Sequence, residues 1–164
     1  MSRISIRDAT IADLPAINTI YNHYVLHSTC TYQTEPSTEA ERAEWFAAHG
    51  PKHPVTVAVM AGEIVGWGSL SRFHPRAAYG NTVEDSVYLH HERRGQGIGS
   101  LLLADLIARA EALGHHCIIG GIDADQKASI ALHAKHGFVS AAHLREVGFK
   151  FGRWLDVVWM QRML

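Results

Sequence analysis

Three glycines at alternate positions lie between a strand-like segment and a long apolar helical pattern. The stretch "RRGQGIGS" carries Gly95, Gly97 and Gly99 directly after two arginines. Glycine loses more conformational freedom on folding than any other residue, so three of them before a helix need a reason. The spacing predicts a stretch of backbone that something else approaches closely. It also places a strand, a glycine turn and a helix in direct succession.

The segments around this turn follow the order expected of one sheet with helices. Alternating apolar residues predict strands, and apolar residues at intervals of three and four predict helices. In the first half of the chain the patterns predict a strand at 4–6, a helix from the Thr10 cap to Val25, a helix after Ser37 or Thr38, and a hairpin of 54–60 and 64–70. A strand at 82–90 and a helix from 98 to the stop at Gly114 follow. The remainder is predicted as a strand at 117–122, a helix at 126–136, and strands at 138–147 and 154–164 joined by 148–153. The expected fold class is α/β, a mixed central sheet flanked by helices in a single domain over residues 1–164.

Composition limits the classes of partner. Of the 164 residues 47% are hydrophobic and 19% charged, and the formal net charge is −1. Without a basic excess, we expect neither nucleic acid nor a membrane surface as a partner. The start of the chain has no signal-peptide pattern, and no run reaches the roughly 20 apolar residues of a membrane span. Cys30 and Cys117 lie far apart and form no CxxC motif, so we expect a reduced, cytoplasmic protein.

The histidines do not form a metal-binding pattern, although there are twelve of them. They include the adjacent pairs at 90–91 and 115–116, but neither HExxH nor a Cys/His ligand spacing occurs. Adjacent side chains on a strand point to opposite faces. We therefore expect no metal site.

Three interpretations compete for the glycine stretch. A tight turn before a helix uses glycine, but three at alternate positions exceed what a turn needs. A dinucleotide site requires GxGxxG, whereas counting from Gly95 puts Ser100 last, and no GK[ST] of a phosphate loop is present. The third interpretation is a cradle for the diphosphate of coenzyme A, where backbone N–H groups and the helix dipole face the phosphates. Arg94, Gly95, Gln96, Gly97, Ile98 and Gly99 fit the pattern R/Q-x-x-G-x-G/A, and this interpretation assigns the role to them and to Ser100, which follows.

The glycine motif and the order of elements together resemble the GNAT acetyltransferase superfamily over nearly the whole chain. Residues 20–36, 82–90, 128–138 and 148–164 narrow the resemblance to the phosphinothricin and methionine sulfoximine N-acetyltransferases. The resemblance implies the GNAT acyltransferase fold, acetyl-CoA as co-substrate and no metal. It implies acetyl transfer to the α-amino group of a small glutamate-like amino acid of the phosphinothricin, methionine sulfoximine or methionine sulfone type. It also implies a cytoplasmic homodimer.

Glu84 is the candidate general base. An α-amino group has a pKa of about 7.7–8.0, so a base must remove its proton before it attacks a thioester. On an unbroken strand Glu84 shares one face with Thr82, Ser86 and Tyr88, while Val83, Val87 and Leu89 face the other way. A carboxylate there is costly unless it is paired or faces a cleft, and the family also places its base at this glutamate. The alternative is a solvated glutamate on an edge strand. Asp85 has the parity of the apolar residues and is the weaker candidate.

The resemblance assigns further residues to the acetyl-CoA tail. Backbone groups of Val87, Tyr88 and Leu89 would bind the thioester carbonyl and the pantetheine arm. Gln126 stands where the superfamily commonly has Asn, and its amide can make the same bonds with a longer arm.

The loop "SRFHPRAAYG" is expected to shape the amino-acid pocket. Arg72 and Arg76 would hold an anionic group of the substrate in bidentate fashion. The expected substrate-binding residues are Arg72, Phe73, His74, Pro75, Arg76 and Tyr79 of this loop, with Glu84, Asp85 and Ser86 of the strand. The alternative is that both arginines are solvated loop residues.

His133 occupies the place where many GNAT enzymes carry a tyrosine thought to protonate the departing thiolate. Its ordinary pKa near 6.5 would allow it to donate to the sulfur or to order water beside Glu84. The alternative is a helix histidine packed against the edge of the sheet.

Two other functions remain open at this level. An acetyltransferase of the same fold could act on a protein N-terminus or a polyamine, although the long Arg72–Asn81 loop argues against a peptide if it closes the pocket. A coenzyme A-binding sensor without catalysis would have no need of Glu84.

Overall fold

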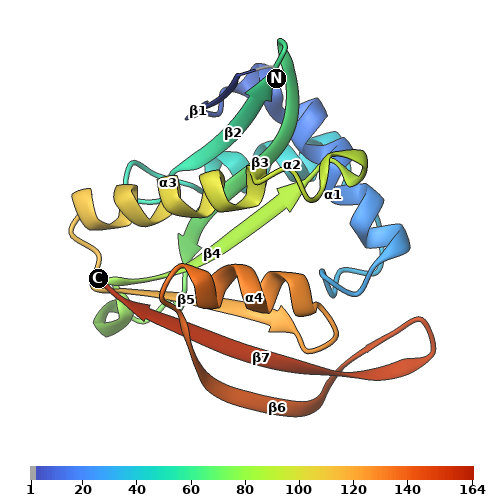
Figure 1. Ribbon diagram of the computed structural model, residues 1–164, viewed down its shortest axis with the longest axis vertical. Helices are drawn as coiled ribbons and strands as arrows, with labels where there is room; N and C mark the ends of the chain where they lie inside the picture. The colour runs from blue at the N-terminus through green and yellow to red at the C-terminus, as the bar shows by residue number, and fades with distance from the viewer. Residues whose placement is uncertain (1–2) are drawn as a thin grey trace.

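A computed structural model describes residues 3–164 of the chain (Figure 1). Its strands are β1 (Ile4–Asp8), β2 (Val55–Met60), β3 (Glu63–Arg72), β4 (Thr82–Leu89), β5 (Cys117–Asp123), β6 (Val139–Lys150) and β7 (Arg153–Met163). Its α-helices are α1 (Leu14–His27), α2 (Glu39–Ala47), α3 (Ile98–Ala112) and α4 (Lys127–Lys135). The strands form one seven-stranded sheet in the order β1-β2-β3-β4-β5-β7-β6. Only β4 and β5 run parallel, so the expected mixed α/β sheet is confirmed.

The two faces of the sheet carry different helices because β3 alternates glycine with large side chains. Gly66 and Gly68 face α3, and a Cβ atom on them would lie 3.2 Å from Leu102 Cδ1 and 3.0 Å from Leu106 Cδ1. Trp67 points the other way and packs with the buried residues of α1. Helices α3 and α4 therefore cover the face turned to the viewer in Figure 1.

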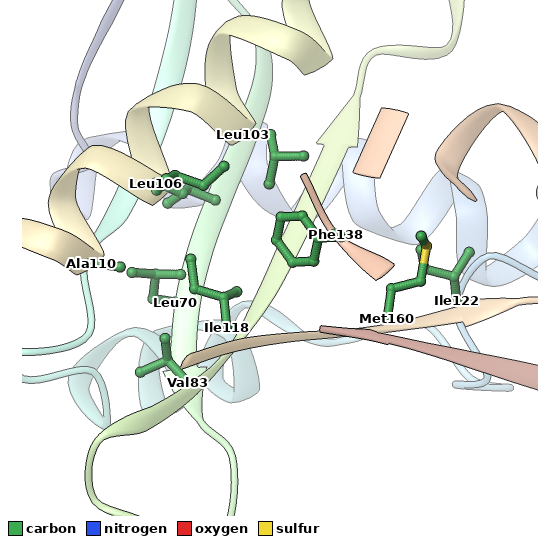
Figure 2. Close-up of a cluster of buried hydrophobic side chains, with 10 residues drawn as sticks. Leu70, Val83, Leu103, Leu106, Ala110, Ile118, Ile122, Phe138 and Met160 are labelled. Atoms are coloured by element: carbon green, nitrogen blue, oxygen red, sulfur yellow. The ribbon is translucent and has the colours of Figure 1, made fainter. Parts of the chain in front are cut away.

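A core of large aliphatic side chains holds α3 on the sheet. Leu103, Leu106 and Ala110 of the helix meet Leu70, Val83 and Ile118 of three adjacent strands, with Ile122, Phe138 and Met160 beside them (Figure 2). Truncating a buried leucine of this kind to alanine costs about 2–5 kcal/mol. The start of α3, and with it the glycine stretch, is held against β4 by a second cluster, in which Ile98 and Leu102 pack with Val87 and Leu89.

The expected cap residues Thr10 and Thr38 both form capping boxes, but Thr10 caps a short 3-10 helix (Ile11–Asp13) that directly precedes α1 rather than α1 itself. The Asp13 carboxylate accepts the backbone N–H of Thr10 at 2.7 Å, and the Glu41 carboxylate accepts that of Thr38 at 2.8 Å. These contacts satisfy N–H groups that a helix start leaves free.

The connection between the last two strands is shorter than the sequence predicts. Gly148 to Lys150 continue β6 and Arg153 opens β7, which leaves Phe151 and Gly152 as the turn. Their φ angles of 51° and 74° fit a two-residue hairpin turn. The prediction of a longer linker over 148–153 was wrong because Gly148 is not a break. It lies inside the strand, where the ring of Tyr32 takes the place of a Cβ atom.

The sheet opens at its centre, between β4 and β5. These strands pair at Thr82–Cys117, Val83–Ile118 and Glu84–Ile119. Beyond Glu84, β4 continues to pair with β3 as far as Leu89, and β5 continues to pair with β7 as far as Asp123. The inner edges of the two strands therefore diverge and leave a gap.

Candidate active site

A cavity of about 490 Å³ fills the gap between β4 and β5. Residues 84–89 of β4 and 120–123 of β5 line it, together with the first turns of α4 and residues 30–32 after α1. One end reaches Arg94, Gly95 and Gly99 at the start of α3. The other end lies at Glu84, where the two strands are paired. The cavity thus joins the predicted diphosphate cradle to the predicted base.

Two left-handed backbone positions shape the cradle. Gly95 has φ 72°, and Gly97, the N-cap of α3, has φ 80°. A Cβ atom on either residue would meet nothing within 4 Å, so conformation rather than crowding requires glycine here. The N–H of Leu101 bonds to the Gly97 carbonyl, which leaves the N–H groups of residues 98–100 without a partner inside the helix. The positive end of the helix dipole at this point favours an anion.

The other residues of the motif have separate tasks. Gly99 serves helix packing, because a Cβ atom on it would lie 3.3 Å from Leu132 Cδ2 of α4. The Ile98 side chain is fully buried in the core. The Ser100 hydroxyl lies 2.7 Å from Nε2 of His136. Arg94, Gly95 and Gly99 line the cavity, whereas Gln96, Gly97, Ile98 and Ser100 lie outside its lining.

Tyr24 ties the cradle to the end of β4. Its hydroxyl donates to the Leu89 carbonyl at 2.5 Å and accepts from Nε of Arg94 at 3.1 Å. The Arg94 guanidinium also lies 4.9 Å from the centre of the Tyr24 ring. Tyr24 therefore holds the Arg94 side chain both through its hydroxyl and through its ring.

Glu84 lies in the cavity on the face that the alternation predicts. Val83 is fully buried, whereas Glu84 is half-buried and lines the cavity. Burial raises the pKa of the Glu84 carboxyl, and the charge of Asp85 raises it further. A carboxyl group with a raised pKa in a cavity suits proton uptake close to neutral pH.

Asp85 and His133 form a buried pair on the other face of β4. Nε2 of His133 lies 2.9 Å from Oδ2 of Asp85, and Nδ1 lies 2.8 Å from the Ser129 carbonyl oxygen. The side chains of Asp85 and His133 are 1% and 5% exposed. Burial lowers the pKa of His133, but the hydrogen bond to Asp85 and its charge outweigh burial and leave that pKa raised. Both ring nitrogens are engaged, so the predicted direct donation from His133 to a thiolate does not fit this geometry.

Gly120 makes room for this pair. A Cβ atom on it would lie 3.0 Å from Oδ1 of Asp85 and 3.1 Å from Nε2 of His133. Within residues 3–164, Oδ1 of Asp85 has no hydrogen-bond partner. The sequence-based prediction missed the pairing, although a signal was present: a carboxylate on the apolar face of a strand needs a partner.

The segment after α1 forms a further wall that the sequence predicts only as a polar loop. Lys150, which is 4% exposed, donates to the carbonyl oxygens of Ser28 and Thr31 in this segment, at 2.7 and 2.8 Å. The Tyr32 hydroxyl donates to Asp123 at 2.8 Å, and Gln126 donates to Thr29 at 3.4 Å. Gln126 lines the cavity, with its amide turned to this wall.

The predicted substrate loop lies beside the cavity rather than in it. Its residues Arg72, Phe73, His74, Pro75, Arg76 and Tyr79 are absent from the cavity lining of the described chain. Arg72 extends β3 opposite Val83, and Arg76 is exposed. The contact is indirect: the Phe73 ring lies 6.3 Å from that of Trp159, which lines the cavity. The structure brings neither arginine to Glu84 within this chain.

Across residues 3–164, no group of three or more His, Cys, Asp or Glu side chains is arranged to hold a metal ion. None of the helices in that range combines the length and the apolarity needed to cross a membrane. Cys30 and Cys117 are both free thiols.

Comparisons with known proteins agree with this geometry. The chain is 43% identical over 159 residues to the L-methionine sulfoximine/L-methionine sulfone acetyltransferase of Pseudomonas paraeruginosa, covering 96% of this chain and 92% of that protein. The phosphinothricin acetyltransferase of Sinorhizobium meliloti, solved with acetyl-CoA, superimposes with a TM-score of 0.96 at 42% identity, covering 100% of this chain and 89% of the other. A ribosomal-protein-alanine N-acetyltransferase of Brucella melitensis superimposes with a TM-score of 0.95 at 41% identity, covering 98% of this chain and 99% of the other. Residues 17–138 match the acetyltransferase (GNAT) family, and the chain belongs to that family.

Proposed function

We propose that the protein transfers acetyl from acetyl-CoA to the α-amino group of a small glutamate-like amino acid, of the phosphinothricin, methionine sulfoximine or methionine sulfone type. The observation that carries this proposal is the continuous cavity from the glycine cradle to Glu84 through the gap in the sheet. Similar proteins carry names with these substrates, and one was solved with acetyl-CoA. Residues 1–164 would act as one catalytic domain.

The residues along the cavity suit acetyl-CoA. Arg94 and the N–H groups at the start of α3 would hold the diphosphate. The inner edge of Val87, Tyr88 and Leu89 has backbone groups that β5 does not pair, and these would bind the pantetheine amides and the thioester carbonyl. Gln126 lies on the opposite wall. When bound, acetyl-CoA supplies an acetyl group activated as a thioester.

Glu84 would remove a proton from the substrate ammonium group. The free amine attacks the thioester carbonyl and the C–N bond forms. The C–S bond breaks with its electron pair left on sulfur, and the thiolate takes up the second proton that the nitrogen loses as the amide forms. Asp85 and Ser86 also line the cavity. The route needs no acetyl-enzyme, and burial raises the pKa of the Cys30 thiol, which makes it a poor nucleophile.

Arg72 or Arg76 would bind the anionic group of the substrate. The contact of Phe73 with Trp159 supports a position of this loop at the rim of the cavity. Closure of the loop over a bound amino acid would bring the arginines toward it, with Phe73, His74, Pro75 and Tyr79 as walls.

We infer a cytoplasmic homodimer that binds neither nucleic acid nor membranes. Phe149 and Trp154, 56% and 61% exposed, support a protein contact on the β6–β7 hairpin. Substituting Trp154 by a charged residue should then shift the mass in solution toward that of a monomer.

One assay tests the proposed function. Release of free thiol from acetyl-CoA is measured with a panel of amino acids, polyamines and short peptides, and the products are identified by mass spectrometry. The proposal expects N-acetylated amino acids, with the glutamate-like sulfoximine, sulfone and phosphinyl compounds among the best substrates. Turnover confined to peptides or polyamines would identify the alternative acetyltransferases. Binding of acetyl-CoA without turnover of any acceptor would identify a sensor.

A further inference from the structure

The geometry of the Asp85–His133 pair fixes its proton content. Nδ1 of His133 faces the Ser129 carbonyl, which only accepts, so Nδ1 carries a hydrogen. Nε2 faces a carboxylate oxygen of Asp85 at 2.9 Å, and a second proton must lie on that contact. Wherever the second proton lies along the contact, the pair has no net charge.

This neutral pair adjoins the proposed base. Glu84 and Asp85 are consecutive residues at the end of the cavity where β4 meets β5. The residues opposite Glu84, Ser71 on β3 and Ile119 on β5, do not ionise. His49, at the end of α2, contacts Ser71 at 3.1 Å, and burial lowers its pKa. The other titratable groups lining the cavity are Tyr24, Cys30, Tyr32, Tyr88, Arg94 and Asp123.

We propose that His133 is the counter-ion of Asp85 and that their neutral pair allows Glu84 to stay ionised as the base. The proposal rests on the proposed function. Without His133, two neighbouring carboxylates would share one partly desolvated site, where like charges disfavour the ionised forms. A larger share of Glu84 would then hold a proton at neutral pH, and that share would be unable to accept another. His133 is thus a positioning residue that acts through Asp85, rather than the acid that protonates the thiolate.

His133→Gln tests this role, because glutamine can donate to Asp85 but carries no charge. The acid limb of the kcat/KM profile for the amino acid should move up by about one pH unit, with activity on the acid side of the limb reduced roughly tenfold and regained at higher pH. Adding Asp85→Asn removes the unpaired charge and should move the limb back toward its wild-type position. A proton donor cannot be restored by changing its neighbour, so failure of this rescue overturns the proposal. His136→Gln, at the C-cap of the same helix, is the matched control and should leave the limb in place.

Two measurements cover the case in which His133→Gln alone does not fold, since it leaves a buried carboxylate unpaired. The double variant should fold and keep its acid limb within about half a pH unit of wild type; a larger upward shift contradicts the proposal. In the wild-type protein, NMR titration of the His133 ring should show both nitrogens protonated well above pH 7. Titration of that ring at or below its ordinary value near 6.5 contradicts it as well. Full activity of Glu84→Gln would instead refute the choice of base, while the NMR titration still reports on the pair.

Discussion

The Tyr24 hydroxyl donates a hydrogen bond of 2.5 Å to the Leu89 carbonyl, so α1 is tied to the last residue of β4. The same hydroxyl accepts from Arg94, beside the glycine cradle. Tyr24→Phe removes both contacts and leaves the ring in place. We expect a loss of about 1 kcal/mol in the free energy of unfolding and a roughly fivefold weaker affinity for acetyl-CoA, measured by calorimetry. Tyr79→Phe, at an exposed position, is the control; equal acetyl-CoA affinities of the two variants would rule out a role for Tyr24 in the cradle.

Gly97 should matter for coenzyme A binding more than for folding. Gly97→Ala forces a side chain into φ 80° at a position with open space around it, which costs about 1–2 kcal/mol and places a methyl group in the cradle. Gly62→Ala, at φ 83° in the β2–β3 turn and equally open, carries the same backbone cost far from the cradle. Both variants should lose similar stability, and only Gly97→Ala should weaken acetyl-CoA binding by about tenfold or more.

A second acyl donor tests whether the weaker acetyl-CoA binding of Gly97→Ala arises at the diphosphate. S-acetylpantetheine has no phosphate groups, so Gly97→Ala should leave kcat/KM for that donor close to the wild-type value. Equal losses with both donors would show that the substitution disturbs the site as a whole.

Asp13 should stabilise the protein in a pH-dependent way. Its hydrogen bond with Arg7 lowers the pKa of the buried carboxyl to about 2. A lowered pKa in the folded state gives stability that is present above the unfolded value near 3.9 and is lost as the pH falls through about 2. Because Arg7 is half exposed, Asp13→Asn should cost only about 1 kcal/mol at pH 7. Denaturant unfolding should show that this difference closes near pH 2; a constant difference from pH 7 to pH 2 would contradict the ionic origin.

Arg72 and Arg76 should affect the amino acid more than acetyl-CoA. Replacing the arginine that reads the substrate's anion by alanine should raise the KM for an acidic amino acid roughly tenfold or more, since a charge-assisted bond is lost. The KM for acetyl-CoA should stay within about twofold. Unchanged amino-acid KM in both variants would place the anion site elsewhere in the chain.

Local patterns of the sequence predict most of this fold. The capping residues Thr10 and Thr38 and the glycine stretch at the start of α3 each depend on neighbours only a few positions away. The β6–β7 turn escaped prediction because Gly148 owes its place to Tyr32, more than 100 residues earlier in the chain. A local sequence pattern does not predict a contact between residues so far apart in the chain.

In the candidate site, too, local sequence pattern predicts some features and tertiary contacts determine the others. The parity of Glu84 along β4 follows from alternation alone, and the structure places it in the cavity. The Asp85–His133 pair, the space left by Gly120 and the buried Lys150 depend on how β4, β5, α4 and β6 come together. The position of the Arg72–Tyr79 loop beside the cavity also depends on a tertiary contact, between Phe73 and Trp159.

The role of Glu84 is tested most directly by Glu84→Gln, which keeps the shape of the side chain and removes its charge. Acetyl-CoA affinity and single-turnover rates with a glutamate-like amino acid are measured on the same preparation. We expect unchanged affinity and a rate lower by roughly 10²–10⁴ at pH 7, with a smaller deficit at higher pH where more of the amine is already free. A rate at pH 7 equal to that of the wild-type protein would contradict Glu84 as the base.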